Sequence, residues 1–569
     1  MQASTDHERR CYCGKLYQTI SSLGRHTRGC PAFSDDCKRF LRLLAYLEPG
    51  PVPGDLFRRA LFPFRKWNEN GNESRERPFQ LPDIFSDEGR LVKAMMDAID
   101  THAVRVTIGS LAPHANHGDP WWAYRNFELP ESSRIFIQNS VNYLDGQLDS
   151  ARLIFHGFSF SDLDVRFVEK GNALLPFVVP LLHKFPVDKL LPGELPSAVE
   201  VCISMSQFGD YNFKEHVLAV AETLAGRIGP SPLDFSIALR KAALALARGQ
   251  AASVWPSPGL NRKGNSQRAE AVLFRAQQCI ELGHLSEAWK LVGQWTPFHA
   301  AQPSGLEIVM SSRLDFMKGK LHRFQGNFEA ARQYLEPLSS QHPPTQVQFS
   351  ARLHLIAVYT ELGLWEKGQT VAGGIEIASG RQRRLYRLAL AELLLSRVLC
   401  GFEEDLLPAK GLFAEIVSEY EGLGGVQFGK TMRRNFFRAC FGLAVIGHLQ
   451  RRGQALFGAL GALSGWELAY RASRECLVVA EGFPDLICHL AMAQLQLSSA
   501  AVQSGPSLER AKQIWAELSN QGLEQRFCFT NLGTRWADMV SEWLEASGCP
   551  RIVSQWGGTA GDAREVPKV

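Results

Sequence analysis

Leu282-Gly283-His284-Leu285-Ser286-Glu287-Ala288 is the first of three similar stretches, and the others are Gln325-Gly326-Asn327-Phe328-Glu329-Ala330-Ala331 and Leu362-Gly363-Leu364-Trp365-Glu366-Lys367-Gly368. Each places glycine second, a large apolar residue two positions later, and alanine or glycine three positions after that. Glycine permits a tight turn, the apolar residue packs against the preceding helix, and the small residue lets two helices approach closely. The pattern predicts helical hairpins that succeed one another along the chain.

The three glycines lie 43 and 37 residues apart, and residues 166–545 around them have mainly helical apolar spacing. Weaker hairpins are expected over residues 392–420 and 437–479. The glycine turns resemble those between the two helices of a tetratricopeptide repeat, although that repeat has a shorter period. The resemblance implies an α-solenoid over residues 166–545 that binds protein partners. Residues 550–569 lack helical spacing, and we expect a disordered tail there.

Residues 35–165 have mixed spacing, and residues 48–54 within them are rich in proline and glycine, which predicts a break in the first helix. Asp55 is expected to cap the helix that comes next. The predicted elements are helices over residues 40–47, 56–61 and 91–98 and a strand over residues 103–108. This order resembles the small winged-helix domain that follows the nucleotide-binding module of fungal signal-transducing ATPases.

Four possible zinc ligands lie within residues 7–32, namely Cys11, Cys13, His26 and Cys30. Twelve residues separate Cys13 from His26 and three separate His26 from Cys30, which is the spacing of a small ββα zinc finger. Tyr17 and Leu23 occupy the positions of the finger's small apolar core. Three thiolates and one imidazole would bind Zn²⁺ in a closed tetrahedral site, which is structural rather than catalytic.

The first cysteine pair departs from this pattern. Only Tyr12 separates Cys11 from Cys13, whereas a usual finger has about two to four residues there. A one-residue spacing brings both sulfurs to one ion only with strain, and His7 could replace Cys11 as a ligand. The alternative is a disordered basic tail whose cysteines are reduced and unpaired.

Eight residues of this segment resemble the finger of fungal zinc-finger regulators. They are Cys13, Gly14, Lys15, Tyr17, Leu23, Arg25, His26 and Cys30. The resemblance implies a nuclear regulator of transcription that binds DNA. Thr19, Ser22 and Arg25 would then face successive bases, and Arg25 could bind guanine through two hydrogen bonds. One finger reads about three base pairs, so the choice of target would need a dimer, a second DNA-binding element or a partner.

The composition narrows the classes of protein. The chain has 569 residues, of which 45% are hydrophobic and 21% charged, as is typical of a globular protein with several domains. A net charge of +4 is too small to indicate nucleic-acid binding by itself. The polar N-terminus predicts no secretory signal, and the lack of a run of about eighteen apolar residues predicts no contact with a membrane. The scattered cysteines favour a reducing compartment, either the nucleus or the cytoplasm.

Other motifs suggest chemistry but have simpler interpretations. Residues 424–431 match a phosphate-binding loop, yet helical spacing precedes them where such a loop needs a buried strand. We interpret them as a glycine-rich turn between helices. Four residues could be metal ligands, namely His102, His114, His117 and Asp119. Ordinary turn residues lie among them, so we expect a solvated loop there. The aromatic residues Trp121, Trp122 and Tyr124 suit a core better than a platform for stacking bases.

The sequence therefore predicts a mainly α protein with an N-terminal zinc finger, a winged-helix-like region and a tetratricopeptide-like α-solenoid. Neither a Gly-x-Ser-x-Gly elbow nor a His-Glu-x-x-His helix occurs, so we expect a non-enzymatic transcription regulator with no small-molecule substrate. The finger would contact DNA and the repeats would bind proteins. Two alternatives remain: a cytosolic scaffold or adaptor with a purely structural zinc site, and the remnant of a signal-transducing ATPase or an unrecognised enzyme.

Overall fold

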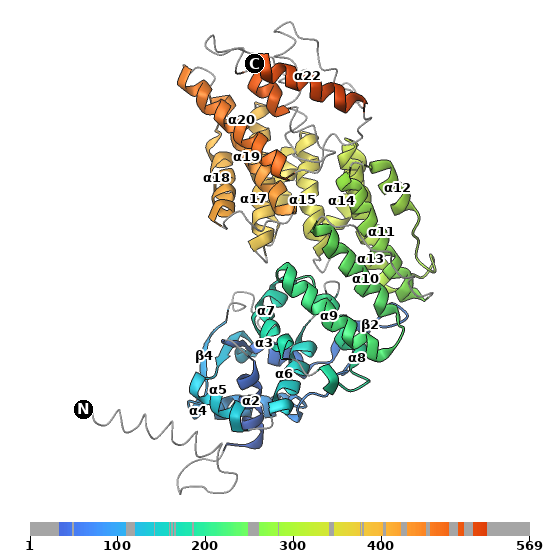
Figure 1. The fold of residues 1–569 in the computed structure, drawn as a ribbon, viewed down its shortest axis with the longest axis vertical. Coiled ribbons are helices and arrows are strands. Elements are labelled where there is room, and N and C mark those ends of the chain that lie inside the picture. Colours follow the sequence, from blue (N-terminus) through green and yellow to red (C-terminus); the bar gives the residue numbers. More distant parts are fainter. Residues whose placement is uncertain are drawn as a thin grey trace, which may run out of the picture. The chain divides into compact units, whose positions relative to one another are not determined.

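The computed structural model shows a mainly helical protein whose chain divides into two compact units, Met1–Gln267 and Arg268–Val569 (Figure 1). We call them the first and the second unit. The described residues are 33–520 with internal gaps. The gaps are residues 48–49, 110–119, 141–142, 159, 161–162, 164–166, 185–186, 249–260, 283, 341–345, 376, 378–379, 402–404, 423–429, 451–455, 477–486, 494 and 496–504. The predicted finger over residues 7–32 and the predicted tail over residues 550–569 lie outside the described residues.

The first unit begins with short helices and strands that alternate. They are α2 (Asp35–Tyr46), β1 (Val52–Pro53), α3 (Gly54–Leu61), β2 (Phe64–Trp67), β3 (Glu73–Glu76), η1 (Asp83–Phe85), α4 (Glu88–Asp100), β4 (Arg105–Ile108), η3 (Trp121–Tyr124) and β5 (Arg125–Glu128). An antiparallel sheet has the order β1-β5-β4, in which Phe127 is the partner of both Val52 and Val106. β2 and β3 form a separate antiparallel hairpin. The predicted helices and strand of this region are therefore present.

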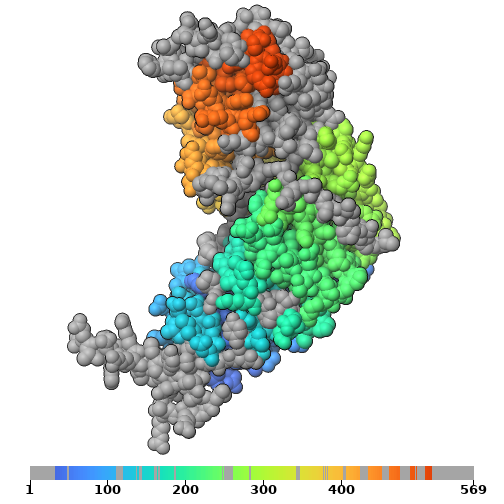
Figure 2. All heavy atoms as spheres, in the orientation of Figure 1, coloured from blue at the N-terminus to red at the C-terminus, as the bar shows by residue number. Residues whose placement is uncertain are grey.

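Helices make up the rest of the first unit. They are α5 (Glu131–Ser140), α6 (Tyr143–Gly157), α7 (Phe167–His183), η4 (Val187–Lys189), α8 (Leu195–Met205), α9 (Tyr211–Ile228) and α10 (Pro232–Ala247). Figure 2 shows the side chains of α7–α9, coloured teal to green, packed closely on one face of the molecule. One hydrophobic cluster runs through the unit from Phe33 to Ile237, so the sheet and these helices share a single core.

The sequence pattern assigned residues 166–267 to the solenoid, whereas the structure groups them with the first unit. The reason is a set of contacts between segments far apart in sequence. Phe208 packs its ring against those of Phe158 and Phe167, with centroids 5.6 and 4.9 Å apart. The buried Glu194 carboxylate pairs with Arg152 of α6 at 2.8 Å. Helical spacing reveals an apolar face but not the core against which that face packs.

Asp55 does not cap the second helix as predicted. α3 begins at Gly54, two residues before the predicted start at Leu56, and its first turn has no side-chain cap. The Asp55 carboxylate is buried and instead bonds to Arg58 and Arg59 in the next turn. A Cβ at Gly54 would lie 2.0 Å from the carbonyl oxygen of Trp122, so only glycine lets α3 approach η3 this closely.

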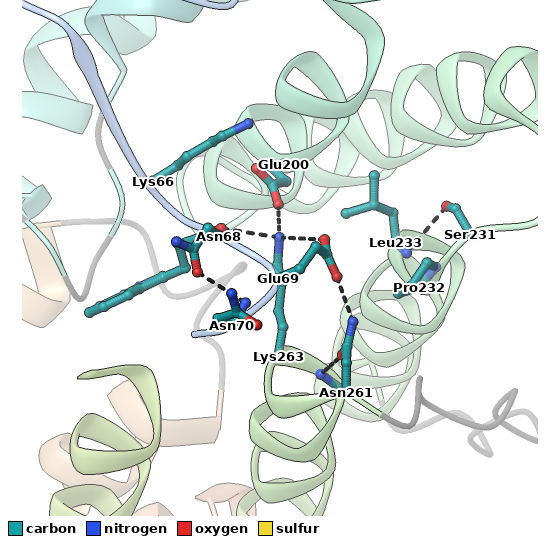
Figure 3. Close-up of polar contacts among 12 residues, drawn as sticks. Lys66, Asn68, Glu69, Asn70, Glu200, Ser231, Pro232, Leu233, Asn261 and Lys263 are labelled. Atoms are coloured by element: carbon teal, nitrogen blue, oxygen red, sulfur yellow. Dashed lines mark hydrogen bonds and ion pairs between the residues drawn. The ribbon is translucent and has the colours of Figure 1, made fainter. Parts of the chain in front are cut away.

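A polar network within the first unit fixes residues 261–263, where α11 (Arg262–Leu282) begins (Figure 3). Lys263 Nζ lies 2.5 Å from Glu200 Oε1 of α8 and 3.8 Å from Glu69 Oε1 in the β2–β3 turn. Asn261 Nδ2 donates to the other oxygen of Glu69 at 2.6 Å. The β2–β3 hairpin thus fixes the position at which α11 begins.

The second unit consists of successive helical hairpins. After α11 come α12 (Leu285–Gly293), α13 (Gly305–Phe324), α14 (Phe328–Ser339), α15 (Gln346–Glu361), α16 (Trp365–Gly373), α17 (Gly380–Leu399), α18 (Leu407–Gly422), α19 (Lys430–Gln450), α20 (Leu456–Cys476) and α22 (Gly505–Asn520). From α12 to α20 each helix contacts the next, and α13, α15, α17 and α19 also contact one another in that order (Figure 1). We call these four helices the first-helix layer. Stacked hairpins in this order are consistent with the predicted α-solenoid.

The predicted glycine turns are confirmed for the second and third copies of the pattern. Gly326 and Gly363 follow α13 and α15 with φ angles of +80° and +70°, a conformation that favours glycine. Trp365, two residues after the second of them, is buried, as is Ala331 at the small position of the earlier copy. Gly283 of the first copy lies outside the described residues.

Two sequence expectations concern the whole chain. In the part of the chain that the structure describes, no helix combines the length and apolar character needed to cross a membrane. The described cysteines form no disulfide with one another and are mostly buried, as their place in apolar helical patterns predicted: Cys37, Cys202, Cys279, Cys400, Cys440 and Cys488.

Candidate functional site

Most of the residues singled out in the sequence lie outside the described residues. These are the zinc-ligand candidates Cys11, Cys13, His26 and Cys30, the alternative ligand His7, the DNA-contact candidates Thr19, Ser22 and Arg25, and the loop residues His114, His117 and Asp119. Among the residues that are described, no group of three or more His, Cys, Asp or Glu side chains could hold a metal ion.

Several other residues that the sequence analysis singled out do lie in the described part of the chain, where their contacts are local ones. His102 follows α4 with a φ of 58°, and its Nδ1 lies 3.2 Å from the carbonyl oxygen of Ile99. Trp122 is buried as predicted, whereas Trp121 is 47% exposed. The segment before residues 424–431 is the helix α18, which is the predicted context for a turn and the wrong one for a phosphate-binding loop.

The structure brings together a group of cationic residues that the sequence did not reveal. Lys320 and Arg323 lie on α13, His354 on α15, and Arg434 and Arg438 on α19. All five belong to the first-helix layer of the second unit. The four cations are near enough to His354 to act on its protonation. We call these five residues the His354 cluster.

His354 is held as a neutral acceptor at the centre of this cluster. Arg323 Nη1 donates to His354 Nδ1 across 3.1 Å, so the imidazole proton resides on Nε2. Burial lowers the pKa of His354 well below its usual range, and the positive charges of Arg323, Lys320, Arg438 and Arg434 lower it further. A histidine in this state adds no charge of its own at neutral pH.

Aromatic side chains contact the cations and the imidazole of this cluster. Lys320 Nζ and the Arg323 guanidinium lie 5.4 and 5.5 Å from the ring centroid of the buried Phe324. Phe316 meets the imidazole of His354 edge-on at 5.3 Å. Cations next to apolar surface interact more strongly with an anion than cations in open water, since the local dielectric constant is lower.

Nearby polar groups orient the cations. The carboxylate of Glu392, only 1% exposed, accepts from Arg438 Nε at 2.9 Å and from Nη2 at 2.5 Å. Lys320 Nζ donates to Gln277 Oε1 of α11 at 2.6 Å. Glu392 offsets the charge of Arg438, whereas all four cations lower the pKa of His354, so positive charge prevails at the imidazole.

The chemistry of these side chains suits the binding of anions. Lysine and arginine only donate hydrogen bonds and stay charged at neutral pH, so they recognise carboxylates or phosphates without transferring protons. Lys320, Arg434 and Arg438 are partly exposed, whereas Arg323 is buried. A ligand would therefore meet three partly exposed cations, of which Arg438 is oriented by Glu392 and Lys320 by Gln277.

The sequence alone does not show that the residues of the His354 cluster meet, because they are far apart along the chain. Arg323 and His354 are 31 positions apart, and Arg438 and Glu392 are 46 apart. Helical spacing assigns each to a helix but does not give the stagger between stacked hairpins. No known protein-family model matches this chain, and no curated protein has significant similarity to it, so the cluster is interpreted from its own geometry.

Proposed function

We propose that this protein is a non-enzymatic regulator whose helical array binds acidic segments of protein partners. The observation that carries the proposal is the His354 cluster, in which Arg323 contacts the imidazole of His354 and three further cations on the same layer of helices help to lower its pKa. Electropositive surfaces speed encounter with acidic partners and disfavour basic ones. Stacked hairpins suit this role because they present an extended surface along which a peptide can lie.

The winged-helix-like region belongs to this proposal as a second protein-binding module. The order α2-β1-α3-α4-β4-β5, with sheet order β1-β5-β4, supports the resemblance, with the β2–β3 hairpin as an insertion. α4 occupies the place of the helix that enters DNA in winged-helix proteins. It has two basic and three acidic residues, and Arg90 pairs with Asp36 at 2.7 Å. Its charge therefore argues against insertion of α4 into DNA.

The N-terminal finger supplies the DNA-binding part of the proposal. Cys11, Cys13, His26 and Cys30 would bind Zn²⁺, and Arg25 would be the main reader of bases, which implies a nuclear protein. The support for this part is the spacing and the resemblance alone. The second candidate is a cytosolic adaptor with a purely structural zinc site. The charge of α4 favours this candidate, because without α4 a single finger would have to make all the contacts with DNA.

The array proposal is tested by binding of a short fluorescent peptide rich in aspartate and glutamate to the full chain. We expect saturable binding that weakens as salt rises, and no binding of a matched lysine-rich peptide. Lys320→Gln and Arg434→Gln should each weaken binding by about tenfold, which corresponds to about 1.4 kcal/mol. Fluorescence anisotropy measures both affinities.

Lys318→Gln is a matched control on the same helix. Lys318 pairs with Asp315 at 2.9 Å and lies 5.7 Å from the ring of Tyr334 on α14, away from His354. Its replacement should leave binding unchanged. Equal losses in Lys318→Gln and Lys320→Gln would show general charge attraction and contradict a site at the His354 cluster.

The finger is tested separately by the zinc content of the full chain. We expect one zinc per chain, lost in Cys13→Ser and His26→Ala. Salt-dependent DNA binding should weaken in Arg25→Ala while zinc is retained. Zinc binding without any DNA binding would favour the adaptor over the transcription regulator, and a chain without zinc would remove both versions of the finger.

A further inference from the structure

The β1-β5-β4 sheet of the first unit ends in β4, whose outer side faces no other described strand. β4 pairs with β5 alone among the described strands, and the register places Arg105 opposite Glu128 and Ile108 opposite Arg125. An edge strand presents backbone N–H and C=O groups to which another chain can pair. The outer side of β4 is therefore where this sheet could gain one more strand.

The hydrogen-bond pattern shows which backbone groups of β4 point away from β5. Gly109, directly after β4, donates its N–H to the carbonyl oxygen of Tyr124 at 2.8 Å. In an antiparallel ladder only alternate residues bond to a given neighbour, so every second residue back from Gly109 bonds to β5, whereas Val106 and Ile108 point the other way. Among the described residues, the outward N–H and C=O groups of Val106 and Ile108 have no hydrogen-bond partner.

The side chains of β4 divide between the two faces of the sheet. Val106 and Ile108 lie on one face, and Arg105 and Thr107 lie on the other. Val106 packs against the core of the first unit, whereas Ile108 is 72% exposed, the highest fraction among the large apolar side chains that the structure describes. A strand added beside β4 would cover Ile108 and extend the apolar face.

Other strands of the unit have the features that usually prevent such pairing. β1, at the opposite edge of the sheet, is two residues long and contains Pro53. β3, in the separate hairpin, has three charged residues, Glu73, Arg75 and Glu76. Short length, proline and charge are common protections of natural sheet edges. β4 has a single charged residue, Arg105, so its edge lacks most of this protection.

Arg105 indicates the charge of the strand that would be added. Its side chain is exposed and forms no ion pair with a described residue, including Glu128 opposite it on β5. In a strand bonded to the outward groups of β4, the residue opposite Arg105 belongs to a pair without hydrogen bonds, where side chains approach most closely. An acidic residue there stabilises the pairing. A second copy of β4 centred on Thr107 would place only a glycine opposite Arg105, which favours a different protein as the source of the strand.

We propose that β4 binds an extended segment of a protein partner as a further antiparallel strand of the sheet. Two apolar residues of that segment lie opposite Val106 and Ile108, and an acidic residue lies opposite Arg105. Main-chain hydrogen bonds supply the affinity, and the alternate side chains supply the specificity. The inference rests on the protein-binding role proposed for the winged-helix-like region and is independent of the His354 cluster and the finger.

A fluorescent peptide with the core Val-Thr-Val-Glu tests the proposal on the full chain by fluorescence anisotropy. Antiparallel pairing places its two valines opposite Ile108 and Val106 and its glutamate opposite Arg105. We expect saturable binding below about 1 mM. Methylation of the backbone nitrogen of the second valine, which faces β4, should weaken binding by about tenfold or more. Methylation of the threonine nitrogen, which faces away, is the matched control and should change binding by less than about twofold.

Arg105→Glu tests the charge of the partner in the same assay. The substitution should weaken binding of this peptide by about fivefold. A peptide with lysine in place of the glutamate should bind the Arg105→Glu variant more tightly than the unaltered chain. Arg75→Glu is the matched control, because Arg75 is an exposed strand cation of the same unit that lies on β3 near Glu73. Its replacement should leave the binding of both peptides unchanged.

Lys320→Gln separates this site from the helical array. It should weaken binding of the peptide rich in aspartate and glutamate and leave the Val-Thr-Val-Glu peptide unaffected. If it weakens both, the second peptide binds at the His354 cluster and the β4 site is wrong. If only the acidic peptide binds the full chain, the array proposal stands and the β4 proposal fails.

Three further results overturn the proposal. The first is equal weakening by the two backbone methylations, since the peptide would then not pair with β4. The second is equal weakening by Arg105→Glu and Arg75→Glu. The third is a dimer of the full chain that excludes the peptide and that Ile108→Pro, which removes an outward N–H, dissociates, since the edge would then belong to a second copy.

Discussion

The two units build their cores differently. In the first unit one hydrophobic cluster joins residues from Phe33 to Ile237, across the sheet and the helices. In the second unit the buried residues divide into successive clusters, which span residues 331–359, 356–393 and 388–514. Segments far apart in sequence support one another in the first unit, whereas each hairpin of the second depends mainly on its neighbours. We therefore expect the loss of one core side chain to destabilise the whole first unit, but only the neighbouring hairpins in the second unit.

Phe57→Ala should have the largest effect and would test the shared core. Phe57 is fully buried, and its ring lies 5.2 Å from that of Phe40 and 6.0 Å from that of Phe127. Loss of the ring should cost about 3–5 kcal/mol of unfolding free energy. Hydrogen exchange should accelerate in α2, β5 and α6 together, and not in α3 alone. Faster exchange limited to α3 would contradict a single cooperative core.

Leu355→Ala tests the opposite expectation in the second unit. Leu355 is buried in the cluster between α14 and α15, and its truncation should cost about 2–5 kcal/mol. Hydrogen exchange should accelerate in α13–α16 and remain slow in α19 and α20. The exposed Lys367→Ala on α16 is a control that should change stability by less than about 0.5 kcal/mol. Uniform loss of protection across the unit would show that its hairpins are not independent.

The same difference explains which parts of the structure the sequence could predict. The hairpins α13–α16 were predictable because glycine, apolar and small residues within seven positions carry the signal. The end of the first unit was not, since Phe167 of α7 and Phe208 between α8 and α9 both pack against Phe158, which follows α6. The His354 cluster was missed for a related reason, because three helices contribute to it and their stagger decides which side chains meet.

Gly363→Val tests whether the repeated turns define the array. Gly363 has a φ of +70°, where a β-branched residue is strained, so the substitution should cost about 1–3 kcal/mol. Gly447→Ala inside α19 is the matched control. A Cβ there would meet nothing within 4 Å, and alanine should stabilise the helix by about 0.5–1 kcal/mol. Urea denaturation of both variants should give changes of opposite sign, and changes of the same sign would contradict this account of the turn.

Mild acid should destabilise the two units to different extents, by less than the substitutions above. Burial lowers the pKa of His322 and, together with four nearby cations, that of His354, both in the second unit. In the first unit burial lowers the pKa of His156. A histidine in the unfolded chain becomes protonated as the pH falls below about 6.5, whereas these histidines stay neutral to lower pH in the folded chain. Their contribution to stability is therefore complete above about pH 6.5 and is lost as the pH falls below that value. Asp55 responds only below about pH 4, the unfolded pKa of aspartate.

Because His322 and His354 lie in the second unit and His156 lies in the first, these three histidines should weaken the second unit more between about pH 7 and pH 5.5, by at most about 1.4 kcal/mol per pH unit for each histidine. Hydrogen exchange corrected for its intrinsic pH dependence measures each unit separately. His354→Gln keeps an acceptor for Arg323 and should reduce the pH dependence of the second unit only, while His156→Gln should reduce that of the first. If His354→Gln leaves the pH dependence intact, His354 is not held neutral by the cations, and the electropositive character of its cluster is contradicted as well.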